Sequence, residues 1–268
     1  MDKTEQVVEI AIIGGTGIYD NDIFKEEEVI KPYTPFGQTS DQITISRYND
    51  KRIAFLPRHG RGHRFPPHMI NYRANLWALR ELGVTRIIAP SAVGSLNHNY
   101  KPGEVILPDQ FIDFTKNRNY SFFDGSQVCH VSMADPFCND LRSIANSCIQ
   151  RLAIPYHSKG TYVCIEGPRF STRAESKMYR DVFKADNIGM TLIPECILAR
   201  ECEICYLSIS TITDYDVWAE QPVTSKDIIE TLQRNVEITR KILSQLIPLI
   251  PSQRDNCSCG SALDDAIL

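Results

Sequence analysis

The chain has 268 residues, of which 43% are hydrophobic and 23% charged, ordinary proportions for a folded protein with a substantial core. The formal net charge of −4 argues against a general nucleic-acid-binding protein, and no apolar run is long enough to cross a membrane. The first residues lack the apolar segment of a signal peptide, so we expect a cytoplasmic protein.

The first predicted strand covers residues 7–13 and is followed by Gly-Gly-Thr-Gly at residues 14–17. A glycine-rich turn after a strand can hold a phosphate on its backbone N–H groups, and Thr16 adds a hydroxyl. A dinucleotide fingerprint is excluded because Asp20 stands where its third glycine should be, and no Gly-Lys-Ser/Thr follows for a Walker loop. Taken alone, the motif is equally typical of a tight structural turn.

A hairpin is predicted from residues 43–47 and 52–57, with Asn49 and Asp50 at its turn. Its second strand ends in Pro-Arg-His-Gly-Arg-Gly-His, residues 57–63. Arginine offers a planar fork that suits a tetrahedral anion, and the glycines let the backbone approach it closely. The alternative is a solvated basic loop.

The next predicted strand, residues 85–89, ends in Pro-Ser-Ala-Val-Gly-Ser at residues 90–95. Small residues at the end of a strand suit an anion or a sugar. Three strand ends, near Thr16, Arg58 and Ser91, therefore carry groups that favour an anion, and we expect them to converge.

The remaining elements are helices over residues 71–82, 136–152 and 224–246, a strand over 156–165, and a loop-rich, aromatic stretch over 101–130. The last helix has Thr224 as its expected N-cap and an apolar stripe at residues 228, 232, 236 and 243. A further helix is expected after residues 166–170, with Ser171 or Thr172 as its N-cap and Glu175 close behind. The aromatic residues from 111 to 123 are too apolar to stay exposed on a monomer, which predicts subunit contacts.

The stretch over residues 187–218 has the pattern of a strand, a helix from about 192, and a buried isoleucine-rich strand over 204–211. The second strand leads to Asp214 and Asp216. In open α/β sheets, ligands bind at this end of a strand, and paired carboxylates beside apolar residues are costly without a use. Glu195, at the helix start, adds a third carboxylate. A solvated turn is the alternative, against which the apolar flanks argue.

Strands alternate with helices and no long linker interrupts them, which predicts one α/β domain, a central mixed sheet flanked by helices, over residues 1–250. Residues 251–268 are expected to be a polar, loose tail containing a Cys-x-Cys pair.

Nine cysteines are many for such a chain, and packing as small buried hydrophobes is the favoured role, ahead of disulfides. A zinc site built from Cys202, Cys205, Cys257 and Cys259 has unsuitable spacing on one side. Because the tail offers little core, we predict that Cys257 and Cys259 form a labile redox pair that reshuffles or protects disulfides. A disordered tail with two free thiols is the alternative.

The motifs together resemble the trimeric purine nucleoside phosphorylases over residues 8–247. The resemblance is closest to the 5′-methylthioadenosine phosphorylases, because inosine- and guanosine-type enzymes carry an asparagine near Asp214-Tyr215-Asp216. The tail resembles that of heat-stable archaeal members. The motifs that carry the resemblance are Gly14–Gly17, Pro57–Gly60, Ser91–Ser95, Glu166–Phe170, Met190-Thr191 and Thr213–Asp216.

The resemblance implies roles for particular residues. Phosphate would be bound by Thr16, Arg58, His59, Ser91, Ala92 and Thr191. The nucleoside would be bound by His63, Phe170, Ser171, Met190, Asp214 and Asp216, together with His130 of a neighbouring subunit in a trimer or a dimer of trimers.

The implied reaction is attack of phosphate on C1′ with inversion, while Asp214, its pKa raised by burial and by Asp216, protonates the departing purine at N7. Phosphate is a co-substrate, and no metal or organic cofactor is needed. The alternatives are a phosphorylase for inosine or guanosine, a hydrolytic nucleosidase, and a non-catalytic nucleoside-binding module.

Overall fold

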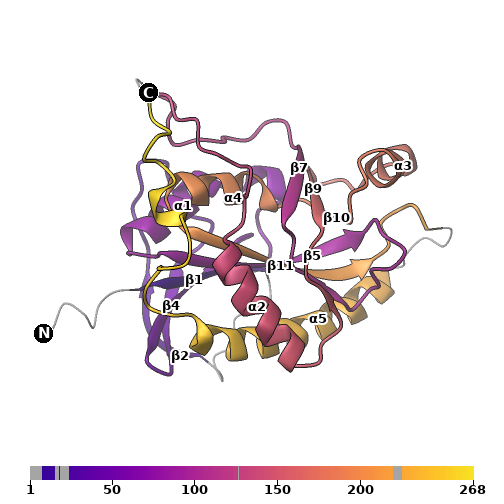
Figure 1. The fold of residues 1–268 in the computed structure, drawn as a ribbon, viewed down its shortest axis with the longest axis horizontal. Helices are drawn as coiled ribbons and strands as arrows, with labels where there is room; N and C mark the ends of the chain where they lie inside the picture. The colour runs from indigo at the N-terminus through magenta and orange to yellow at the C-terminus, as the bar shows by residue number, and fades with distance from the viewer. Residues whose placement is uncertain (1–7, 16–17, 19–23, 126, 220–224) are drawn as a thin grey trace, which may run out of the picture.

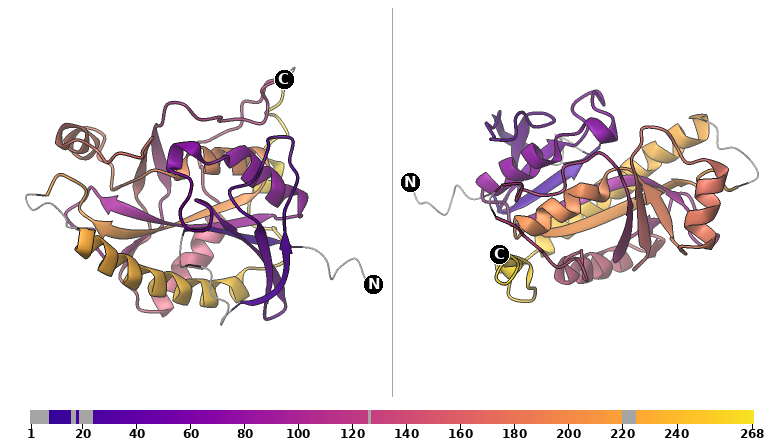
Figure 2. Two further views of the ribbon diagram at one scale, coloured as in Figure 1. Left: turned by 180° about the vertical axis from the view of Figure 1, so that it is seen from behind. Right: turned by 90° about the horizontal axis from the view of Figure 1, so that it is seen from above.

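The computed structural model describes residues 8–15, 18, 24–125, 127–219 and 225–268, except the side chains of residues 225–229 (Figure 1). In these residues, eleven strands form one mixed sheet with helices on both faces, which confirms the predicted α/β fold (Figure 2). The strands are β1 (Ile10–Gly14), β2 (Lys25–Ile30), β3 (Ile43–Tyr48), β4 (Lys51–Pro57), β5 (Arg86–Ser95), β6 (Val105–Ile106), β7 (Gln110–Phe114), β8 (Tyr156–His157), β9 (Thr161–Ile165), β10 (Asn187–Gly189) and β11 (Cys205–Asp214).

Strand β5 is where the sheet branches. Its first residues pair with β1, its last residues pair with β10, and β11 runs parallel to it along most of its length. One path through the sheet is β2-β3-β4-β1-β5-β10-β9-β7, while β11 also pairs with β6 and β6 with β8. Because β1, β4, β5 and β11 are parallel, their carboxyl ends meet at one edge of the sheet.

Alternating side chains of the buried strands divide the core between two faces. Ile10 and Ile12 pack with α2 and α5, whereas Ala11 and Ile13 pack with α1 and α4. Figure 2 shows these two helix layers on opposite sides of the sheet. The helices are α1 (Tyr72–Glu81), α2 (Asn139–Arg151), α3 (Arg173–Asp181), α4 (Leu192–Glu201) and α5 (Ser225–Leu246), with short 3₁₀ turns at Pro67–Met69, Ile247–Leu249 and Cys259–Ser261.

Helix α3 begins with the predicted capping arrangement. The Thr172 hydroxyl accepts from the backbone N–H of Glu175 at 3.1 Å, and the Glu175 carboxylate accepts from the backbone N–H of Thr172 at 2.7 Å. Two otherwise unpaired donors are satisfied in this way. The predicted N-cap of α5, Thr224, lies outside the described residues.

The tail differs from the loose segment that the sequence predicts. Cys259 is 5% exposed and belongs to the core on the α2–α5 face, and Cys257 packs against that core. The backbone N–H of His130 donates to the Ala266 carbonyl at 2.8 Å, and that of Leu268 donates to the Val128 carbonyl at 2.9 Å. Figure 1 shows the yellow tail ending beside the loop before α2. Apolar burial and backbone pairing hold this tail to the body of the protein.

All nine cysteines lie in the described part of the chain, and none is in a disulfide. The predicted disulfide chemistry of Cys257 and Cys259 is therefore not confirmed. No helix among the described residues is both long and apolar enough to cross a bilayer.

Candidate active site

One cavity of about 650 Å³ opens at the carboxyl edge of the parallel strands. The ends of β1, β4 and β5 reach it through Gly15, Arg58 and Ser91, so the three predicted anion-binding strand ends do converge. The end of β11 contributes Asp214 and Asp216, and helix α5 closes another side. A cavity of this volume fits a nucleoside-sized ligand with a small anion.

Arg58 is 2% exposed and its guanidinium is held from several sides. Its Nε and Nη2 donate to the two carboxylate oxygens of Glu195, at 2.7 and 2.8 Å, and Nη2 also donates to the Ile13 carbonyl at 2.9 Å. One N–H of Nη1 donates to the Pro90 carbonyl at 3.1 Å. At most one N–H, on Nη1, therefore remains for an anion. The two-point fork that the sequence predicts for phosphate binds Glu195 instead.

The charge of Arg58 is secured by this arrangement. Burial disfavours the charged guanidinium, but the Glu195 carboxylate outweighs that effect and raises the pKa of Arg58. Glu195 is fully buried and also accepts a hydrogen bond from the Tyr206 hydroxyl at 2.8 Å.

His59 and His63, in the loop after β4, stack on each other with ring centroids 4.1 Å apart. His59 Nδ1 lies 2.9 Å from the Phe65 carbonyl oxygen, and because a carbonyl only accepts, Nδ1 carries the proton. Burial, with a smaller contribution from Arg58, lowers the pKa of His59 to about 4. The ring is therefore neutral near pH 7, and its Nε2 is a hydrogen-bond acceptor.

Another part of the cavity lining comes from β5 and from the turn into α4. Ser91 and Ala92 line the cavity from β5, and Met190 and Thr191 line it from the turn after β10. Thr191 precedes α4 without using its side chain as a cap, so its hydroxyl is not committed to the helix. This wall presents hydroxyl groups and a helix start to the region near Arg58.

Asp214 and Asp216 form the acidic end of the cavity. Asp214 accepts from the Thr213 hydroxyl at 2.6 Å through Oδ2 and from the backbone N–H of Asp216 at 2.7 Å through Oδ1. Burial raises the pKa of Asp214 against these two hydrogen bonds, and it also raises the pKa of Asp216. Oδ2 of Asp216 is buried and has no hydrogen-bond partner among the described residues.

Phe170 and Ser171 line the cavity from the loop after β9. Phe170 is 68% exposed, while the buried Ser171 hydroxyl has no partner within the described part of the chain. The exposed ring of Phe170 on the cavity lining is suited to stack on a flat ligand.

Comparison with known proteins decides the family. A sequence profile of the phosphorylase superfamily matches residues 9–248. The chain belongs to the phosphorylase superfamily.

Several relatives in this superfamily are similar over nearly their whole length. The S-methyl-5′-thioadenosine phosphorylase of Hyperthermus butylicus is 56% identical over 99% of this chain and 98% of its own, and that of Nitrosopumilus maritimus is 58% identical over 98% and 99%. Among solved structures, a methylthioadenosine phosphorylase from an antarctic soil metagenomic library has a TM-score of 0.93 at 43% identity, covering 98% of this chain and 93% of its own. The Schistosoma mansoni enzyme in complex with adenine has a TM-score of 0.89 at 36% identity, covering 96% of each chain.

His130, which was expected at the site, is exposed and lies beside the tail, away from the described lining of the cavity. Thr16 lies outside the described residues, although Gly15 before it lines the cavity. The aromatic residues Phe111, Tyr120 and Phe122 pack against the chain's own core, so they give no support to subunit contacts.

Sequence reasoning missed two parts of this superfamily site. It noted Glu195 but did not pair it with Arg58, and it read the apolar stripe of α5 only as core. Leu232 and Val236, one turn apart on that stripe, line the cavity, and so do Asn235 and Thr239. The polar residues at 235 and 239, beside the stripe and again one turn apart, were the available signal.

Proposed function

We propose that this protein cleaves 5′-methylthioadenosine with phosphate, giving adenine and 5-methylthioribose 1-phosphate. The observation that carries the proposal is the single cavity that joins the Arg58–His59 loop to the Asp214–Asp216 pair. The first provides a fixed positive charge for phosphate, and the second provides carboxylates for a purine. Relatives at 56–58% identity that bear the name S-methyl-5′-thioadenosine phosphorylase support the same reaction.

At the phosphate end, the phosphate dianion is bound by one charged group, several neutral hydrogen-bond donors and one acceptor. Arg58 supplies charge and one N–H, while Ser91, Thr191 and the backbone at Ala92 supply further donors. The bare Nε2 of His59 accepts a hydrogen bond from a protonated phosphate oxygen. The sequence adds the Thr16 hydroxyl to this set. These groups align phosphate behind C1′, which is mainly a proximity effect.

The purine end stabilises the leaving group. Asp214, whose pKa is raised by burial, is the general acid that gives a proton to N7 as negative charge develops on the base. Asp214 also accepts from the 6-amino group, and Asp216 lies beside it at the base edge. Phe170 stacks on the base, Ser171 bonds its edge, and Met190 and His63 contact the sugar. The reaction as proposed uses no metal and no organic cofactor.

The 5′ substituent faces an apolar wall. Leu232 and Val236 present side chains without hydrogen-bonding groups to the cavity, and Pro67 lies on its lining as well. A methylthio group loses little on leaving water for such a wall, whereas a 5′-hydroxyl leaves its hydrogen bonds behind. This wall favours methylthioadenosine over adenosine.

We further propose a trimer or a dimer of trimers in which His130 of one subunit closes the cavity of the next. His130 is exposed, and it is absent from the described lining of its own chain's cavity. Light scattering on the purified protein tests this, and an active monomer would exclude it. Nine cysteines without a disulfide fit a reducing compartment, so we place the reaction in the cytoplasm.

The deciding experiment measures release of free base from methylthioadenosine, adenosine, inosine and guanosine, each with and without phosphate. We expect phosphate-dependent release, with kcat/KM highest for methylthioadenosine and lowest for the two 6-oxopurine nucleosides. A rate that survives removal of phosphate would indicate a nucleosidase. Faster cleavage of inosine or guanosine would indicate an inosine- or guanosine-type phosphorylase. Binding without release of base would exclude catalysis.

A further inference from the structure

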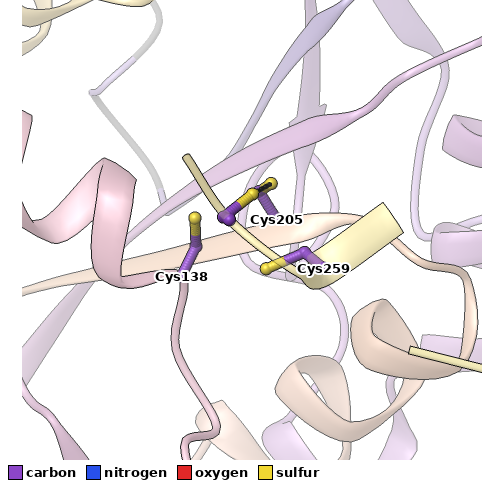
Figure 3. A group of neighbouring side chains, drawn as sticks. Cys138, Cys205 and Cys259 are labelled. Carbon is purple, nitrogen blue, oxygen red and sulfur yellow. Dashed lines mark hydrogen bonds between the residues drawn. The ribbon is translucent and has the colours of Figure 1, made fainter. Parts of the chain in front are cut away.

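Four cysteines from three distant segments meet on the face of the sheet covered by α2 and α5. Cys138 precedes α2, Cys205 begins β11, and Cys257 and Cys259 belong to the tail. All four Sγ atoms lie within 4.8 Å of one another. Figure 3 shows the side chains of Cys138, Cys205 and Cys259 turned toward one another.

The spacing of the sulfur atoms is that of a tetrahedral metal site. A zinc ion bound by four thiolates at about 2.3 Å places its sulfurs about 3.8 Å apart. The Sγ atoms of Cys205 and Cys257 are 3.5 Å apart, well beyond the ~2.05 Å of a disulfide bond. Four sulfurs around one point, with no pair at bonding distance, match a shared central ion.

The surroundings favour thiolates over neutral thiols. The backbone N–H of Leu141, in the first turn of α2, points at Cys138 Sγ from 3.5 Å, and Arg200 Nη1 donates to Cys259 Sγ at 3.6 Å. Zinc with four thiolates carries a net charge of −2. A helix N-terminus and a guanidinium offset that charge, as donors around metal-bound cysteines do.

We propose that Cys138, Cys205, Cys257 and Cys259 bind one Zn²⁺ ion in a structural site. Four protein ligands leave no open position for water or substrate, which separates this site from a catalytic zinc. None of the four cysteines lines the active-site cavity. The site instead fastens the tail to the body, at the end of β11 opposite Asp214, about 30 Å away along a ten-residue strand.

The zinc site weighed from the sequence had a different set of ligands, with Cys202 beside Cys205. In the structure, Cys202 is buried in the core on the α1–α4 face of the sheet. Cys138 takes its place, because the start of α2 lies next to the start of β11, where the backbone N–H of Cys138 donates to the Tyr206 carbonyl at 3.0 Å. With Cys138 as the fourth ligand, the site no longer depends on the spacing of two cysteine pairs that made the set with Cys202 unsuitable.

The test is the metal content of the full chain, purified without chelators under reducing conditions from cells grown with added zinc. Elemental analysis should find one zinc per chain. Cys138→Ser and Cys259→Ser should each reduce zinc to less than a tenth of that amount. Cys148→Ser and Cys196→Ser, which change buried cysteines outside the cluster, should retain it. Replacing zinc by Co²⁺ should give the visible absorption of a tetrahedral thiolate site.

A second measurement keeps the proposal open to refutation if the serine variants do not fold. The wild-type protein is alkylated in denaturant without reductant, and its intact mass is measured. Nine alkylated cysteines in a protein that had contained one zinc would support the site. A zinc-free protein, whether these cysteines are disulfide-bonded or are free thiols, would overturn it, and so would stoichiometric iron in place of zinc.

Discussion

Arg58 and Glu195 form a buried two-point ion pair, with Nε and Nη2 of the arginine at 2.7 and 2.8 Å from the two carboxylate oxygens. The pair joins the loop after β4 to the start of α4, and both segments line the cavity. An arginine held in this way delivers its charge to an anion without having to be ordered when the anion binds. In the proposed phosphate site, Glu195 therefore acts through Arg58.

Arg58→Ala should raise the phosphate KM by about 10- to 100-fold, because a hydrogen bond to a charged group contributes about 1.5–3 kcal/mol. It should also destabilise the fold by about 3–5 kcal/mol, since the buried Glu195 loses its partner. Steady-state kinetics with varied phosphate and chemical unfolding measure the two effects.

Arg86→Ala is the matched control for this prediction. Arg86 is also 2% exposed, but it bonds the Gln253 carbonyl and does not line the cavity. Its loss should lower stability and leave the phosphate KM unchanged. The double variant Arg58→Ala, Glu195→Gln should regain stability but not phosphate affinity. If Arg58→Ala leaves the phosphate KM at the wild-type value, Arg58 has no part in the phosphate site.

Asp214→Asn should lower kcat on methylthioadenosine by about 10²–10⁴-fold, the usual contribution of a general acid. It should also relax discrimination against inosine, because an amide can donate to a 6-oxo group, whereas the single carboxyl proton of Asp214 is used at N7. The ratio of kcat/KM for adenosine to that for inosine is the measurement. Asp186→Asn, which alters a carboxylate bonded to Asn97 outside the cavity, should leave the ratio as it is. An unchanged ratio in Asp214→Asn would remove this residue from base recognition.

Asp216→Asn should be less active and more stable than the wild type at pH 7. Burial raises the folded-state pKa of Asp216, so the folded state holds its proton more tightly and stability is lost as pH rises through that pKa. Asparagine removes this cost and also tolerates the left-handed backbone at φ 51°. The gain in melting temperature should shrink as pH falls and vanish below the ordinary aspartate pKa of 3.8. A gain that does not vary with pH, or a loss at pH 7, would contradict this account.

Gly189→Ala should destabilise the protein by at least ~1–3 kcal/mol through overpacking. An added Cβ would lie 1.9 Å from the Tyr162 hydroxyl oxygen and 3.3 Å from Val93. Adding Tyr162→Phe should restore part of the loss, because the hydroxyl is the nearest obstacle. Gly125→Ala, with nothing within 4 Å of its added Cβ, should be neutral. Urea unfolding compares the three variants, and equal midpoints for Gly189→Ala and Gly125→Ala would refute the clash.

Elements specified by their own sequence were predicted well. The hairpin of β3 and β4 turns at Asn49 with φ 53°, and helix α3 has its capping box at Thr172. Strand β2 was missed because its sequence, KEEEVI, is mostly exposed at the edge of the sheet. Strand β7 lies in a stretch read as loop, since its pairing with β9 depends on residues far along the chain.

In the candidate site, too, some residues could be predicted from local sequence and others could not. Predicted strand ends indicated Arg58, Ser91 and Asp214 because ligand-binding groups follow parallel strands. The sequence could not indicate that Glu195, 137 positions away, occupies the fork of Arg58. Nor could it bring Cys138 to the tail cysteines. These contacts depend on how the helices lie on the sheet, which local patterns do not specify.

The pairing of residues 266–268 with residues 128–130 has a practical consequence for handling the protein. A purification tag fused after Leu268 would be attached within a few residues of the backbone bond between His130 and Ala266. If His130 serves the neighbouring subunit, such a tag would perturb both assembly and nucleoside KM. Kinetic constants and particle masses from this fusion should be compared with those of protein from which the tag has been removed.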